Sequence, residues 1–265
     1  MPATRTVRLN GDTNLLKLVA IVAMLIDHVG ARLYPQYRVL REIGRLAFPL
    51  FAYCMAAGCV YTRNIGKYAL RVLVFAAATQ PIYMIAMSHA PAGFDWLRGY
   101  YRVDLILQWF YSGHLNILFS LFLGILVIWT VRDGKYALTA LLAAAAFVLS
   151  GYIDYGSNGI ILMALFYAFI DKPLAAAVST GLFMLYMGLP AAFTNVWFLG
   201  SGAFLSGEWL ASLRLYPRTQ IYALAALPLI ICPMKSKVKI PKYFFYAFYP
   251  GHLLLIHLIK TYAMR

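Results

Sequence analysis

Residues 15–34 form an apolar stretch, LLKLVAIVAMLIDHVGARLY. It is long enough to cross a bilayer as one helix, because the hydrocarbon core requires about 20 apolar residues. Asp27 and His28 lie well inside it. An ionisable side chain in hydrocarbon is costly unless it meets a partner or a water-filled cavity, so it marks a functional site by default. The stretch therefore predicts a spanning helix that carries part of a polar site.

The composition of the whole chain favours a membrane protein. Of its 265 residues, 63% are hydrophobic and 12% are charged, whereas soluble domains are about half apolar and a quarter charged. The net charge of +14 does not indicate nucleic-acid binding, because little polar surface remains and bases between spans are ordinary topology signals. Anionic lipid headgroups or a polyanionic substrate are the alternative partners for these bases.

The order of apolar segments predicts an all-α fold. We expect a polytopic transmembrane helical bundle of about ten spans (eight to ten, since several are short), built as a single domain over residues 1–265. The ten segments are 15–34, 46–62, 68–88, 114–131, 136–151, 158–170, 174–190, 193–210, 219–233 and 243–262.

Two features of the connections qualify this topology. Residues 89–113 are long, aromatic and mixed in charge, which predicts an interfacial segment or lid lying along the headgroups. The distribution of lysine and arginine modestly favours a cytoplasmic N-terminus. The bases in 32–45 and 235–242 then fall on the opposite side. Either the number of spans is off by one, or these bases serve a negatively charged ligand.

The sequence offers no metal or disulfide pattern. Cys54, Cys59 and Cys232 lie in apolar segments without a CxxC pair, so no disulfide framework is expected. The histidines are scattered, and HExxH, GxSxG and Walker motifs are missing from the sequence. We therefore expect no metal.

The geometry of the first predicted helix separates its polar residues. Lys17 and His28 are eleven positions apart, so they lie on nearly one face, separated by about 16 Å along the axis. Asp27 is turned by about 100° from His28 and cannot orient it directly. We expect Asp27 to pair with a base on another helix, Arg45 first. The alternative to a catalytic role is a structural ion pair that locks two helices.

Basic residues also mark the starts of the second and third predicted spans. Arg45 followed by Pro49 indicates a kinked helix start that suits a cavity wall. Arg63, Lys67 and Arg71 recur every four residues and predict one basic stripe. The stripe is either a topology anchor or a rim that binds phosphates.

Further polar residues lie at the edges of later spans. His114 and Asn116 begin the fourth span and are candidates for a wall of the polar cavity. Asp154 lies in IDYGSNG, which predicts a turn and helix cap. His252 follows a Tyr-Pro-Gly break and is placed at the cavity, whereas His257 faces away.

Six motifs in this order resemble the TraX family of membrane proteins, which is named for acetylation of F-type pilin. They are LKLVAIVAMLIDHVG (16–30), IGRLAFPLFAY (43–53), TRNIGKYALRVLVFA (62–76), GHLNILFSLFLG (113–124), DYGSNGIILM (154–163) and FYAFYPGHLLLIHLIK (245–260). The family is in turn similar to the multi-span membrane acyltransferases. These carry a basic residue and then a histidine on the first core helix, positions that Lys17 and His28 would fill.

The resemblance implies an enzyme of the bacterial inner (cytoplasmic) membrane, crossing it several times. It would move an acetyl group from cytoplasmic acetyl-CoA to an amine or hydroxyl of an acceptor (a pilin N-terminus, a peptide or a glycan), with His28 as general base. The candidate catalytic residues are His28, Asp27, Arg45, His114 and Asn116, of which Asn116 or Arg45 would donate to the developing oxyanion. The candidate residues for binding acetyl-CoA are Lys17, Arg63, Lys67, Arg71 and His252.

Two other classes stay open on the sequence alone. Intramembrane Asp27 and His28 also suit a proton-coupled transporter, although paired interrupted helices in matching halves are not evident. A membrane scaffold without chemistry is the third interpretation. In the enzyme interpretation, direct transfer and an acetyl-histidine relay are both possible.

Overall fold

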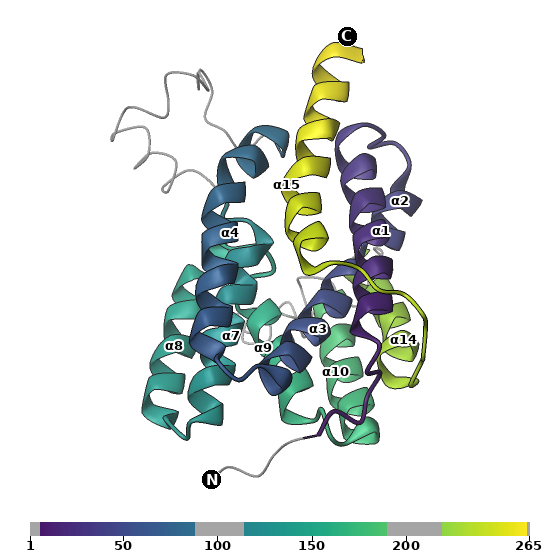
Figure 1. Cartoon of the computed structure of the whole chain (residues 1–265). Helices are drawn as coiled ribbons and strands as arrows, with labels where there is room; N and C mark the ends of the chain where they lie inside the picture. Colours follow the sequence, from purple (N-terminus) through teal and green to yellow (C-terminus); the bar gives the residue numbers. More distant parts are fainter. Residues whose placement is uncertain (1–5, 88–113, 190–218, 264–265) are drawn as a thin grey trace, which may run out of the picture. The chain divides into compact units, whose positions relative to one another are not determined.

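A computed structural model describes residues 6–87, 114–189 and 219–263, and this part of the chain is all-α (Figure 1). It contains no strand, only an isolated bridge between Leu115 and Ile153. The helices are α1 (Thr13–Arg32), α2 (Arg38–Gly44), α3 (Ala47–Tyr61), α4 (Ile65–Ala86), α7 (Ile117–Arg132), α8 (Tyr136–Val148), α9 (Gly156–Ala168), α10 (Pro173–Gly188), α14 (Leu227–Ile231) and α15 (Lys242–Leu258), with shorter turns η1 (Leu149–Gly151), η3 (Thr219–Ala226) and η4 (Ile259–Ala263).

The helices agree closely with the predicted apolar segments. The predicted span 15–34 corresponds to α1, and the predicted span 136–151 corresponds to α8 with η1. The predicted span 193–210 and the predicted interfacial segment 89–113 lie outside the described residues. Helix α2 was not expected, because its sequence RVLREIG has the charges of a loop.

The break between α2 and α3 has a local cause. The two helices are separated by Arg45 and Leu46. Pro49 has no N–H to donate to the carbonyl of Arg45 four residues earlier, and its ring crowds that carbonyl. The predicted kink is therefore present, with Pro49 in the first turn of α3, where proline is tolerated.

Among the residues that the structure describes, three helical stretches are long and apolar enough to cross a membrane. They are Thr13–Arg32, Arg38–Tyr61 and Ile65–Ala86. Five shorter apolar helices of 10–17 residues follow in the described part of the chain. The expectation of about ten full spans is thus met only in part, because most later helices are shorter than the bilayer core requires.

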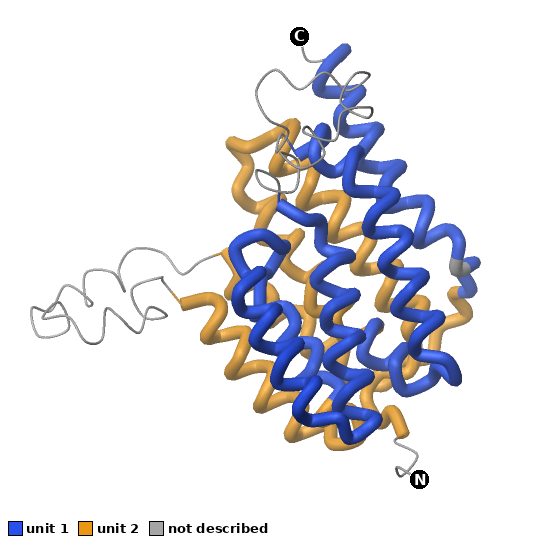
Figure 2. Tube along the Cα trace, turned by 90° about the vertical axis from the view of Figure 1, so that its left-hand side faces the viewer, with its two compact units in different colours: residues 1–4, 55–167, 239–265 blue, residues 5–54, 168–238 orange. Residues whose placement is uncertain are grey.

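The chain divides into two compact units, coloured separately in Figure 2. Unit 1 contains residues 55–167 and 239–265 with a short N-terminal piece, and unit 2 contains residues 5–54 and 168–238. Helix α3 contributes its first half to unit 2 and its second half to unit 1. Each unit is described by itself below.

In unit 2, the segment before α1 is fixed by Asn10. This residue is fully buried, and its backbone N–H and side-chain amide donate to the carbonyls of Ile230 and Leu229 at 2.8 and 2.7 Å. The hydroxyl of Tyr53 donates to the carbonyl of Asn10 at 2.7 Å. These bonds satisfy backbone carbonyls at the end of α14, which a helix terminus otherwise leaves unpaired.

Asp12 caps α1 and makes stability depend on pH. Hydrogen bonds from Ser236 and from the backbone of Leu15 lower the pKa of this carboxyl below its ordinary value of 3.8. Because the folded pKa is the lower one, this stabilisation is present above about pH 3.8 and is lost as the pH falls through the folded pKa. Asparagine also caps helices well, so Asp12→Asn isolates the charge.

We expect Asp12→Asn to lower the free energy of unfolding slightly at pH 7 and to differ less from the wild type at pH 3. Chemical unfolding of the detergent-purified protein at the two pH values measures this. A difference between the two proteins that is the same at both pH values would contradict the assignment.

In unit 1, the end of α3 and the start of α9 are each fixed by identifiable residues. Arg132 at the end of α7 donates to the carbonyls of Cys59 and Thr62 at 3.2 and 3.3 Å, which caps the last turn of α3. The turn before α9 has Tyr155 and Gly156 at positive φ, 60° and 53°. The predicted glycine turn is therefore present, and its tyrosine adopts a conformation that is rare for a bulky residue.

Candidate functional site

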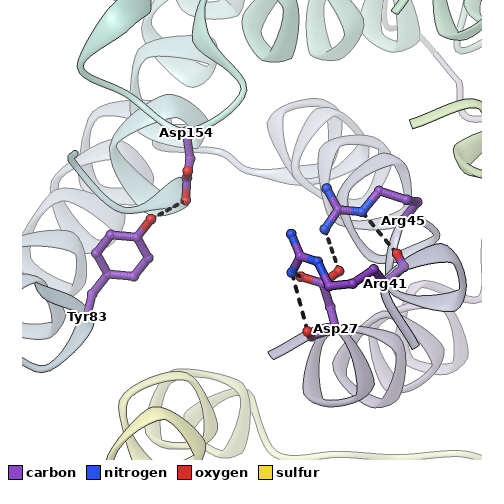
Figure 3. Close-up of polar contacts among 5 residues, drawn as sticks. All are labelled: Asp27, Arg41, Arg45, Tyr83 and Asp154. Carbon is purple, nitrogen blue, oxygen red and sulfur yellow. Dashed lines mark hydrogen bonds and ion pairs between the residues drawn. The ribbon is translucent and has the colours of Figure 1, made fainter. Parts of the chain in front are cut away.

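Asp27 forms the centre of a buried ion cluster in unit 2 (Figure 3). It lies on α1 with 7% of its surface exposed. Arg41 Nη1 donates to Asp27 Oδ2 at 2.5 Å, and Arg45 Nη2 forms an ion pair with Asp27 Oδ1. The predicted pairing of Asp27 with Arg45 is confirmed.

Small residues let α1 and α2 approach closely enough for this cluster. A Cβ added at Gly44 would overlap the side chain of Asp27, and one added at Gly30 would lie 2.6 Å from Leu40 Cβ. Arg41 and Arg45 are one turn apart and are linked by a bond from Arg45 Nε to the carbonyl of Arg41 at 3.2 Å. Two guanidinium groups against one carboxylate leave the cluster with a formal charge of +1.

Lys17 and His28 lie on the same continuous helix, α1. Eleven residues of helix return to nearly the same face after about three turns. Both side chains are half-buried. His28 directly follows the ion-paired Asp27, so the helix that carries it is held on α2 by two charged contacts.

The predicted basic stripe is only partly helical. Helix α4 begins at Ile65 and is capped by Asn64, whose side chain accepts from the N–H of Lys67 at 2.8 Å. Arg63 therefore precedes the helix and does not continue its face, which corrects the expected run of three. Lys67 and Arg71 are one turn apart, and all three bases are exposed.

Asn116 is the centre of a buried network between α4 and α7 in unit 1. Its amide donates to the carbonyl of Ala76 at 2.9 Å and to Gln80 Oε1 at 2.8 Å. Its Oδ1 accepts from the N–H of Leu118 and caps α7. Gln80 Nε2 in turn donates to the carbonyl of the exposed His114 at 3.0 Å. Both amide hydrogens of Asn116 are thus engaged, so stabilising an oxyanion would require it to release one bond.

We expect Asn116→Ala to lower the free energy of unfolding by about 2 kcal/mol, because it removes a helix cap and leaves buried polar groups unpaired. Chemical unfolding in detergent measures the change. Asn64→Ala is the matched control, since it removes an exposed cap of α4 and is expected to lose only about 1 kcal/mol. Equal losses from both variants would contradict a role for the buried network.

A second polar contact in unit 1 involves Asp154. The hydroxyl of Tyr83 on α4 donates to Asp154 Oδ2 at 2.9 Å (Figure 3). Ser120 Oγ on α7 donates to the carbonyl of Asp154 at 2.5 Å. The predicted turn residue thus also connects the turn to two helices.

His252 lies on α15 with 5% of its surface exposed. Its Nδ1 is 2.8 Å from the carbonyl of Phe248, and its ring stacks on that of Phe248 at 5.0 Å between centroids. These contacts fix the ring within its own helix. His257 on the same helix is half-buried.

The cysteines and the possible metal ligands are considered for the residues that the structure describes. Within them, no group of three His, Cys, Asp or Glu side chains is arranged to hold a metal ion. Cys54 and Cys59 are buried free thiols, and Cys232 is an exposed one.

Two site residues escaped the sequence analysis. Arg41 was treated only as a loop base, because α2 was not foreseen. Gln80 could have been identified from the sequence, because it is an amide inside the apolar helix α4, directly before Pro81. A buried amide in such a helix requires a partner.

Comparisons with known proteins agree with the sequence motifs. The model of the TraX protein family matches residues 12–260. A probable fimbrial assembly protein FimC, serogroup H1, of Dichelobacter nodosus is 31% identical over 117 residues, which cover 43% of each chain. An uncharacterised protein of Rickettsia prowazekii (strain Madrid E) is 29% identical over 159 residues. The match covers 57% of this chain and 53% of the Rickettsia protein.

The matches to these curated relatives extend over about half of their length. No solved structure matches the chain. The family match, in contrast, covers nearly all of the chain and includes the ion cluster of α1 and α2, the Asn116 network and His252. The chain therefore belongs to the TraX protein family.

Proposed function

We propose that this protein is a membrane-embedded acetyltransferase that moves an acetyl group from acetyl-CoA to an amine or hydroxyl acceptor. The observation that carries the proposal is the buried Asp27 with its two arginines, directly beside His28 on α1, in a chain of the TraX family. Such a cluster is costly to bury, and intramembrane ionisable residues mark functional sites.

His28 acts as the general base in this proposal. A neutral imidazole can take a proton near pH 7. As the acceptor attacks the thioester carbonyl, its nitrogen or oxygen bonds to the acetyl carbon and the carbon–sulfur bond breaks. His28 takes the proton of the nucleophile and returns it to the leaving thiolate. Asp27, held by Arg41 and Arg45, positions the helix that carries His28.

The donor's phosphates require basic side chains. Lys17 lies on the face of α1 that carries His28, about 16 Å away along the axis, a separation that suits the thin arm of acetyl-CoA. Arg63, Lys67 and Arg71 are exposed and clustered at the start of α4, so they are able to form charge-assisted hydrogen bonds to phosphate. His114 and Asn116 stay proposed catalytic residues, and His252 stays a proposed residue for binding acetyl-CoA.

We further propose that the acceptor is a pilin N-terminus, a peptide or a glycan. A relative whose name is probable fimbrial assembly protein supports the first of these. The proposed location is the bacterial inner membrane, crossed by about ten helices with a cytoplasmic N-terminus. The three long apolar helices support membrane insertion.

Binding of acetyl-CoA to the detergent-purified full chain, measured by calorimetry, tests the proposal. We expect the affinity to fall about tenfold in Lys17→Ala, equivalent to about 1.4 kcal/mol, and to stay unchanged in His28→Ala. Lys172→Ala, at an exposed lysine before α10, is the matched control. A folded wild type that does not bind acetyl-CoA would contradict the proposal and favour the proton-coupled transporter.

A further inference from the structure

A cavity of about 410 Å³ lies between α4 and α15 of unit 1. These helices pack side by side (Figure 1). Its volume is within the range of small-molecule sites, about 300–1,000 Å³. On α4 it is lined by Phe75, Ala78, Thr79 and Ile82. Their spacing places all four on one face of the helix.

The opposite wall repeats this pattern. On α15 the lining residues are Tyr243, Tyr246, Ala247 and Pro250, which also share one face. The rings of Phe75 and Tyr246 stack with centroids 4.2 Å apart and planes at 14°. Apart from one threonine and two tyrosine hydroxyls, every lining side chain is hydrocarbon. The walls therefore form an apolar groove along two helices.

The surface beside the groove is also apolar. Val74 on α4 is 56% exposed, and Phe244 and Leu254 on α15 are 45% and 46% exposed. Helix α4 is one of the three helices long and apolar enough to cross a membrane. Large exposed apolar side chains near an apolar groove are typical of a surface that contacts a membrane or another apolar partner. The groove therefore faces hydrocarbon, and its natural occupant is a lipid chain.

Basic residues gather at one end of the groove. Lys239 lies three residues before the start of α15 and belongs to the same unit as the groove. Lys239 is exposed, and so is Arg71, one turn before Phe75 on α4. Both helices rise in the same direction in Figure 1, so Lys239 and Arg71 precede the same end of the groove. Such clusters beside apolar helices attract anionic lipid headgroups.

We propose that the groove between α4 and α15 binds one anionic phospholipid. Its acyl chain lies between the two helix faces, and its phosphate lies at Lys239. Lys239 is not among the residues proposed above to bind acetyl-CoA, so it distinguishes this site from the proposed donor site. Lys239 then has a role other than that of a topology signal.

Native mass spectrometry of the full chain in detergent tests the acyl-chain part, with added phosphatidylglycerol or phosphatidylcholine of identical acyl chains as the probes. We expect the wild type to bind one phosphatidylglycerol at least fivefold more tightly than phosphatidylcholine. Ala78→Trp fills the groove and should weaken binding of both lipids at least fivefold. Ala77→Trp is the matched control, because it makes the same change at an exposed neighbour outside the lining.

The headgroup part has its own pair of variants. Lys239→Gln should weaken phosphatidylglycerol binding about threefold and leave phosphatidylcholine binding unchanged. Lys260→Gln, at an exposed lysine after α15, should change neither. Equal affinity of the wild type for the two lipids would overturn the proposal. So would an Ala78→Trp variant that folds and binds lipid like the wild type, because another part of the chain would then fill the groove.

Discussion

Asp27→Asn is expected to lower the free energy of unfolding by about 3 kcal/mol or more. The substitution keeps the shape of the side chain but removes the only charge between Arg41 and Arg45 in this cluster. Asp27 is 7% exposed, and the side chain of Arg45 is 14% exposed. Breaking a buried ion pair from one side leaves an uncompensated charge, which is more destabilising than losing the pair itself. Chemical unfolding in detergent measures the loss.

A variant that removes all three charges separates stability from function. Asp27→Leu combined with Arg41→Met and Arg45→Met should restore most of the stability lost in Asp27→Asn, because well-packed apolar residues often replace a buried ion cluster without loss. If the cluster only locks two helices, this triple variant should also keep the activity. If it positions His28, the activity should be lost in a stable protein. An Asp27→Asn variant as stable as the wild type would contradict the ion cluster itself.

The helical part of the fold could be predicted from the sequence because each apolar segment carries its own signal. The segment 15–34 identified α1 within two residues at each end, since capping and hydrophobic length are local properties. Helix α2 was missed for the converse reason. Its three charged positions resemble a loop, and the contact of Gly44 with Asp27 helps to explain why it packs on α1. Long-range packing of this kind leaves no local pattern.

The contrast between local signals and long-range packing also explains which parts of the candidate site could be predicted. Asp27 and Arg45 were paired correctly because a buried carboxylate requires a base and few were near. The contact of Tyr83 with Asp154 spans 71 residues, and nothing in either segment specifies the other. Asn116 was recognised as a residue at the start of a span. Its side-chain amide already donates hydrogen bonds to Ala76 and Gln80 on α4, which the sequence did not indicate. Local sequence identified the polar residues, whereas tertiary structure determined which of them are already engaged.

His28→Gln is expected to lower kcat for acetyl transfer by about 10²–10⁴-fold, the usual contribution of a general base. Glutamine keeps a similar size and hydrogen bonding but cannot take a proton at neutral pH. The protein should stay folded, since His28 is half-buried on a helix held by Asp27. Acetyl-CoA binding should be unchanged, so that the loss falls on kcat alone. Transfer of labelled acetyl groups to a pilin peptide or an amino sugar measures this.

His257→Gln is the matched control, because it makes the same substitution at a half-buried histidine of α15 and should leave kcat within twofold. A His28→Gln variant with normal kcat would contradict the assignment of His28 as the general base, and another residue would then have to transfer the proton. The label also separates the two routes of transfer. In direct transfer, His28 only moves the proton and no acetyl group stays on the protein. A trapped acetyl-protein that is absent from His28→Gln would instead assign His28 the role of nucleophile in a covalent relay.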